Sequence, residues 1–213
     1  MRRVLIPFVM LLSVAACGPV AGLGTPGPTA TNVAVQPGDV PSGMHKCDLS
    51  GDMNSYLKKI QAKDPSTYST TKAQWDAAQK DGATGAEAVF YTDSTEHCAA
   101  LANNGTQIGT ATYKLVVNFV FQFKDQVSAE NGYKNDSIFG FSAASLKSMQ
   151  IPAVEGAATG LGSNSIVVSA AIANQSFYVA VWQKKQFMVI LGNVNVDTAA
   201  DKKMALAVDG RIH

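Results

Sequence analysis

Three apolar segments near the end of the chain are joined by very short connections. The shortness of these connections restricts the fold more than any other feature of the sequence. The segments span residues 165–172, 177–183 and 186–191, so the connections have four and two residues. A parallel crossover needs about a dozen residues or more, so the segments are predicted to form an antiparallel meander. Apolar residues occupy both faces of the last two, which predicts central strands, covered by helices on one face and by loops or a ligand on the other.

Alternation and helical spacing predict the remaining elements. Residues 113–124 alternate apolar and polar side chains, as in an antiparallel strand with one buried face, and a shorter strand is expected over 86–92. Met53, Tyr56, Leu57 and Ile60 fall on one face of a helix over 51–63, which Asp64-Pro65 is expected to end. Further helices are predicted from Thr70 or Thr71 to 80, and over 95–102, 125–134 and 198–212.

These elements predict one folded domain over residues 43–213. Its fold class is α+β, with an antiparallel sheet of about four to six strands, helices packed on the sheet and a helix at the C-terminal end. About 170 residues are enough to enclose a hydrophobic core of ordinary size.

The first residues have the pattern of a secretory signal. Arg2 and Arg3 precede an apolar run over residues 4–14, which is shorter than the ~20 residues that a membrane-spanning helix needs. The run ends in Val14-Ala15-Ala16-Cys17, which resembles the lipobox of bacterial lipoproteins. That resemblance implies a signal peptide over residues 1–16, cleavage before Cys17, and acyl chains on Cys17 that anchor the protein in the membrane. An ordinary cleaved signal is the alternative.

Residues 17–42 have the composition of a spacer. The stretch is rich in Gly, Pro, Ala and Thr and nearly free of charge. We therefore expect it to be a flexible linker between the lipidated Cys17 and the folded domain. The expected location is the cell membrane, with the protein on its extracytoplasmic face.

Charge and cysteine content narrow the function further. The chain has 17 Lys and Arg against 16 Asp and Glu, so it offers no strong positive field for nucleic acid. Besides Cys17 it has Cys47 and Cys98, and an even pair in an oxidising compartment predicts a disulfide bond. A zinc site that also uses His45 and His97 is the competing interpretation. The adjacency of His97 and Cys98 disfavours it, because zinc ligands in structural sites are usually separated by two or more residues.

Catalytic signatures are weak throughout. The glycine-rich segment over residues 160–165 precedes a predicted strand, so it lacks the helix that a phosphate-binding loop requires. The chain contains no G-x-S-x-G motif, and its acidic residues are scattered over predicted helices and caps. We therefore expect a protein without catalytic residues, metal or cofactor.

Aromatic residues provide the remaining hint of a site. They are concentrated on the predicted strands, where most aromatic side chains belong to the core. If the second apolar face of the sheet instead lines a cleft, Tyr178 and Trp182 are the expected ligand contacts. A lipid, a cell-wall fragment or another amphipathic molecule fits such a surface.

A second resemblance begins at about Val89 and rests on the helix with Cys98 and on the segments NFVFQFKDQVSAENGY, GLGSNSIVVSAA, FYVAVWQKKQFMVIL and ALAVDGRI. In these segments the chain is similar to small secreted lipoproteins of actinobacteria and to the extracellular sensor domains of certain mycobacterial serine/threonine kinases. It implies an α+β domain with room for a cleft, and no catalytic residues. The function expected is non-enzymatic binding or sensing of a small amphipathic ligand, and the alternative is a scaffold for a protein partner at the cell envelope.

Overall fold

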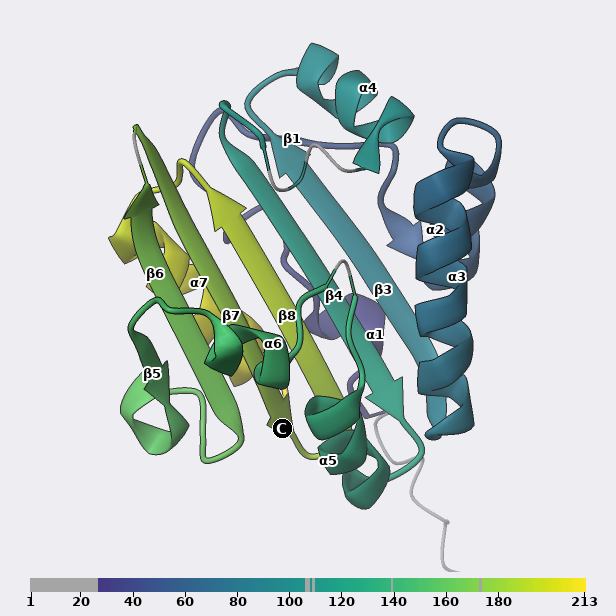
Figure 1. Cartoon of the computed structure of the whole chain (residues 1–213), viewed down its shortest axis with the longest axis vertical. Coiled ribbons are helices and arrows are strands. Elements are labelled where there is room, and N and C mark those ends of the chain that lie inside the picture. Colours follow the sequence, from purple (N-terminus) through teal and green to yellow (C-terminus); the bar gives the residue numbers. More distant parts are fainter. Residues whose placement is uncertain (1–26, 106–107, 109, 139, 173) are drawn as a thin grey trace, which may run out of the picture.

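The computed structural model describes residues 27–105, 108, 110–138, 140–172 and 174–213. Its centre is an eight-stranded sheet in the order β1-β3-β4-β8-β7-β6-β5, with β2 also paired to β3. Every pairing is antiparallel (Figure 1). The long strands are β3 (Ala83–Thr92), β4 (Leu115–Phe123), β6 (Ser165–Ile172), β7 (Gln175–Lys184) and β8 (Phe187–Val194).

The predicted meander is confirmed, while the predicted number of strands is too low. β6, β7 and β8 pair in sequence, and β8 also pairs with β4, so β7 and β8 are central. The strands beyond the expected four to six are β1 (His45–Lys46), β2 (Gly51–Asp52) and β5 (Ala153–Glu155). They have two or three residues each, and an alternation that short is not recognisable in a sequence.

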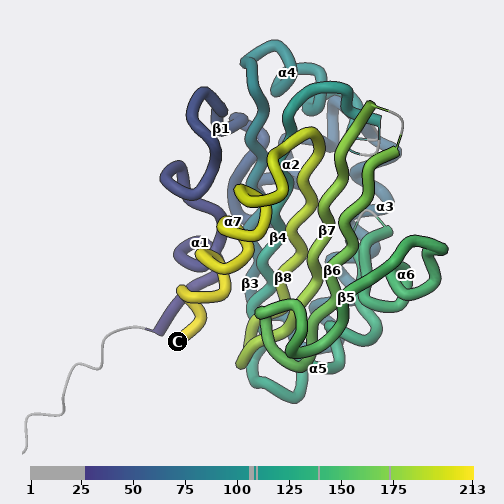
Figure 2. Tube along the Cα trace, turned by 90° about the vertical axis from the view of Figure 1, so that its left-hand side faces the viewer, coloured from purple at the N-terminus to yellow at the C-terminus, as the bar shows by residue number. Residues whose placement is uncertain are grey.

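Helices cover both faces of the sheet (Figure 2). The face toward the viewer in Figure 1, here the front face, carries α2 (Met53–Gln61), α3 (Pro65–Lys80), α5 (Gln126–Asn135) and α6 (Ala143–Ser148). The opposite back face carries α1 (Ala30–Val33) and α7 (Thr198–Gly210), and α4 (Thr95–Asn103) lies at the β1 end of the sheet. Each face has its own hydrophobic core, and β7 and β8 contribute residues to both.

Asp64-Pro65 begins a helix as well as ending one. The sequence predicts the second helix from Thr70 or Thr71, but α3 starts at Pro65. The Asp64 side chain accepts hydrogen bonds from the backbone N–H and the hydroxyl of Thr67, and proline at the first helical position lacks only an N–H that has no helical partner.

The described part of the expected linker is folded. Within residues 27–42, α1 packs on β3 and β4, and Val33, Ala34 and Val35 are buried on the back face. Asn118 on β4 fixes the segment by accepting a hydrogen bond from the Val35 backbone N–H at 2.9 Å. The segment has too few apolar residues for a core of its own, but it completes a core that the sheet already supplies. The folded domain therefore begins before residue 43; residues 1–26, with Cys17, lie outside the described residues.

Candidate functional site

Tyr178 and Trp182, the predicted ligand contacts, lie on the back face of β7 within the core beneath α7. They share this core with Met204 and Val208 of that helix, and their side chains are almost completely buried. Burial raises the pKa of Tyr178 above its usual range, and the neighbouring Asp201 carboxylate adds to that effect. In the described structure this pair therefore belongs to the core beneath α7, as the core interpretation of the aromatic residues expects.

The front face of the same strands holds an apolar pocket instead. Its cavity measures about 300 Å³. Its floor is formed by the first residues of β4 and β7 and by the last residues of β6 and β8, which lie at the same end of the sheet. Strand residues in this floor include Leu115, Val117, Val168, Phe177, Val179 and Val194. Because side chains alternate along a strand, Phe177 and Val179 face this pocket while Tyr178 faces the other way.

Gly192 creates the depth of this pocket. It lies on β8 between Val117 of β4 and Val179 of β7, and both of these neighbours line the cavity. A Cβ atom built on Gly192 meets no heavy atom within 4 Å, so the missing side chain leaves open space above the strand. Glycine inside a strand weakens the strand and often marks a close approach to a ligand.

The wall of the pocket comes from the segment between β4 and β6 and from Ile108. Phe141, Leu146, Met149 and Ile151 contribute apolar side chains. α6 is held in place by a capping box, in which Ser142 Oγ accepts from the Ser145 backbone N–H at 3.0 Å and Ser145 Oγ accepts from the Ser142 backbone N–H at 2.8 Å. The wall is thus a short capped helix and its flanking turns, a construction that moves more easily than a sheet.

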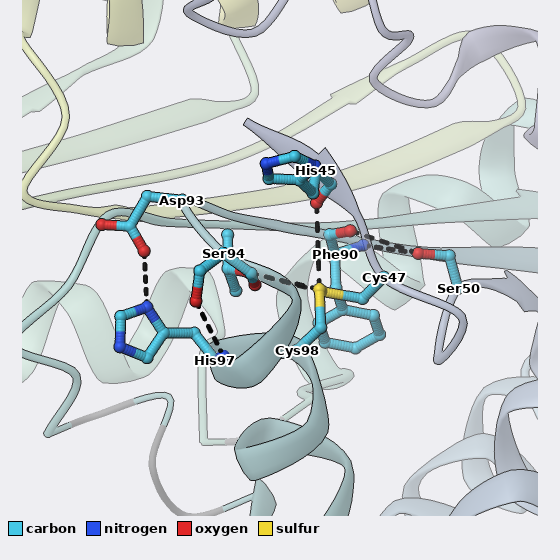
Figure 3. The surroundings of a disulfide bond; sticks show 9 residues. His45, Cys47, Ser50, Phe90, Asp93, Ser94, His97 and Cys98 are labelled. Carbon is cyan, nitrogen blue, oxygen red and sulfur yellow. Dashed lines mark hydrogen bonds and ion pairs between the residues drawn. A yellow bond between two sulfur atoms is a disulfide. The ribbon is translucent and has the colours of Figure 1, made fainter. Parts of the chain in front are cut away.

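The predicted disulfide bond joins Cys47 and Cys98 (Figure 3). It connects the residue after β1 to α4, and the Ser94 side chain caps α4 by accepting a hydrogen bond from the His97 backbone N–H at 3.1 Å. His97 does not face the sulfur atoms. Its Nδ1 lies 2.6 Å from Asp93 Oδ1 and its ring stacks on Tyr113 at a centroid distance of 4.0 Å.

The zinc interpretation has no support in this geometry. Both thiols are used by the disulfide, and the His45 ring lies on the far side of its own backbone carbonyl, which faces Cys98 Sγ (Figure 3). Within the described ranges no group of three or more His, Cys, Asp or Glu side chains is placed to hold a metal ion.

Two of the buried carboxyl groups have raised pKa values. Asp201 of α7 accepts a hydrogen bond from Asn193 Nδ2 at 2.8 Å, and burial raises the pKa of its carboxyl to about 7. Burial, with a smaller contribution from Asp81, raises the pKa of Asp136 to about 6. Neither carboxyl lines the apolar pocket, and Asp201 lies on the opposite face of the sheet. These acids therefore affect the stability of the domain rather than the chemistry of the pocket.

The sequence contained one signal for the pocket, namely a lone glycine at the end of an apolar strand. The third segment of the meander was expected to end at residue 191, but β8 continues to Val194 and includes Gly192. The wall residues carry no such signal, because Phe141, Leu146 and Ile151 are ordinary apolar residues in a segment without clear periodicity.

Comparison with solved structures identifies a similar fold. The extracellular domain of PknH from Mycobacterium tuberculosis superposes with a TM-score of 0.50 and 12% sequence identity, covering 86% of this chain and 94% of that chain. At this identity the similarity concerns the fold, which agrees with the resemblance to kinase extracellular domains seen in the sequence. No protein-family model and no curated protein matches the chain. Across its described ranges, the chain has no helix long and apolar enough to cross a bilayer.

Proposed function

We propose that this protein is an extracytoplasmic lipoprotein, anchored in the membrane through Cys17, that binds a small apolar or amphipathic ligand without catalysing a reaction. The pocket over Gly192 is the observation that carries the ligand-binding part of this proposal. The lipobox-like sequence supports the anchor, and the fold shared with an extracellular domain agrees with a location outside the cytoplasm.

The lining of the pocket defines the class of ligand. It is built from aliphatic side chains and Phe141 and Phe177, and the Asn193 side chain is directed to the other face, where it bonds Asp201. A lining of this kind gains free energy by removing apolar surface from water, at about 25 cal/mol per Å². The cavity is at the lower end of the ~300–1,000 Å³ range of small-molecule sites, so it suits one short chain or ring.

The test is a titration with the neutral dye N-phenyl-1-naphthylamine, whose fluorescence rises in apolar surroundings. We expect the purified protein to bind the dye saturably. Gly192→Leu should reduce the affinity by at least about tenfold, because the leucine side chain fills the cavity. Gly192 has an ordinary strand conformation, so this substitution introduces no strained backbone.

Gly38→Leu is the matched control. Gly38 is exposed, has the same open surroundings at its Cβ position and lies outside the pocket, so this variant should bind the dye like the unaltered protein. Equal dye binding by Gly192→Leu and the unaltered protein would contradict the proposal, provided that circular dichroism shows both to be folded.

A protein partner is the second candidate, and exposed apolar residues at the same edge favour it. Ile172 is 54% exposed and Met149 is 39% exposed, and both lie at the border of the pocket. Such residues at the rim would also serve a scaffold that docks an apolar side chain of another envelope protein into the pocket. This alternative predicts no saturable binding of the isolated dye.

A further inference from the structure

A second pocket lies beside the disulfide bond, where β1, α2 and α4 come together. Its cavity measures about 390 Å³, and its lining residues are all different from those of the apolar pocket. The floor is apolar, formed by Leu49, Ala99, Ala102 and the disulfide of Cys47 and Cys98. The disulfide fixes α4 to the end of β1, so it holds two walls of this pocket together.

Three lysines surround the floor. Lys46 comes from β1, Lys59 from the last turn of α2 and Lys63 from the residues after it. Lys59 is oriented by its own hydrogen bond, because its Nζ donates to the Ser50 carbonyl at 2.6 Å. Among the ion pairs of the described residues, none involves these three lysines.

The lining carries an excess of positive charge, and outside the lining Asp52 lies close enough to Lys59 for this lysine to help lower the Asp52 pKa. Asp48 is the one acidic residue in the lining, against Lys46, Lys59 and Lys63. An excess of positive charge above an apolar floor suits a molecule that has both an acid group and an apolar part. The acid group gains charge-assisted hydrogen bonds to the lysines, and the apolar part is removed from water. Lysine ammonium groups on flexible stems accept carboxylates and phosphates as point charges.

We propose that this pocket binds a small anionic amphiphile, with its acid group at Lys46, Lys59 and Lys63 and its apolar part on Leu49, Ala99 and Ala102. A dissolved molecule fits the placement better than a membrane surface. α4 lies at one end of the molecule, and the described chain begins at residue 27 toward the opposite end (Figure 2). The pocket therefore lies at the end of the molecule away from residue 27.

The experiment is a titration with octanoate, followed by the backbone amide resonances of Ala99 and Ala102 in two-dimensional NMR. We expect saturable shifts that weaken as salt is added, because ions screen the lysines. The double variant Lys46→Gln/Lys63→Gln should lower the octanoate affinity by at least about tenfold, since it removes two charged hydrogen-bond donors. Octanol, which lacks the charge, should leave both resonances in place.

Two control variants test whether octanoate binding depends on this pocket, rather than on the overall charge of the protein or on the apolar pocket. Lys202→Gln removes one exposed lysine of α7 on the other face of the sheet and should not change octanoate binding. Gly192→Leu should not change it either, so loss of the dye site and loss of the octanoate site are independent results. The proposal is overturned if a folded Lys46→Gln/Lys63→Gln protein binds octanoate with unchanged affinity, or if octanol shifts the same resonances equally.

Discussion

At the scale of single residues, Asp201 links the stability of the domain to pH. Its carboxyl is buried beneath the sheet with one side-chain donor, Asn193 Nδ2, while Asn193 Oδ1 accepts no hydrogen bond from the described residues. A protonated Asp201 can donate to that oxygen and complete the pair, whereas an ionised Asp201 is a desolvated charge. The arrangement favours the protonated form, in agreement with the raised pKa.

The free energy of unfolding should therefore fall as the pH rises from 5 to 8. The folded pKa of Asp201, about 7, exceeds the ordinary value of 3.8, so between these values the folded state binds more protons than the unfolded state. Stability is then greatest below that window and is lost as the pH rises through the folded pKa. Asp136, with a pKa of about 6, acts in the same direction.

Urea unfolding of the unaltered protein and of Asp201→Asn at pH 5 and pH 8 measures this effect. The amide keeps the shape of the side chain and does not ionise, so the variant should lose less stability between the two pH values. An equal loss in both proteins would show that Asp201 does not contribute to the pH dependence.

At the scale of elements, the disulfide bond holds α4 against the start of the sheet. The two cysteines are separated by 51 positions, and closing a loop of this size reduces the entropy of the unfolded chain. We expect Cys47→Ala/Cys98→Ala to lower the free energy of unfolding by about 4 kcal/mol in urea titrations. A loss below ~1 kcal/mol would mean that the bridge adds little beyond the packing of Cys47 and Leu101 in the core.

The elements that the sequence predicted well are those with long periodic patterns. β6, β7, β8, α2 and α7 bury apolar residues as the sequence pattern indicates. β4 was predicted to bury one face, but it is buried on both, because α1 and α7 cover the face that carries Val116 and Val120. The choice between the two faces of β7 was not predictable, because Tyr178 and Trp182 on one face are as apolar as Phe177 and Val179 on the other. Which face is closed and which stays open is decided by α7 and α6, elements distant in sequence.

At the scale of the whole molecule, Arg211 joins the two ends of the described chain. Its Nη1 donates to the carbonyl oxygens of Val33 and Ala34 at 3.1 Å each, and its Nη2 donates to Asp39. The end of α7 thereby fixes the segment that connects the domain to residues 1–26. Together with the Asn118 hydrogen bond and the back-face packing, this contact makes residues with the composition of a linker part of the fold.

Arg211→Ala should release that segment without unfolding the sheet. Loss of these charge-assisted bonds should weaken its docking by about 2 kcal/mol, which corresponds to roughly 30-fold faster amide hydrogen exchange at Val33 and Ala34. Lys184→Ala is the matched control, because it removes the ion pair to Asp209 near the same end of α7. Unchanged exchange in Arg211→Ala would show that the back-face packing alone holds the segment.

The strands at the two edges of the sheet affect whether copies of the protein can aggregate by strand addition. A long border strand offers a row of free backbone groups on which another molecule can add a strand, the first step of aggregation. Here β1 and β2 cover β3 in two pieces of two residues, and β5 covers the start of β6 with three. For a protein proposed to be anchored in a membrane, where copies collide within one plane, these interrupted borders give a neighbouring copy no long continuous edge to extend into a fibre.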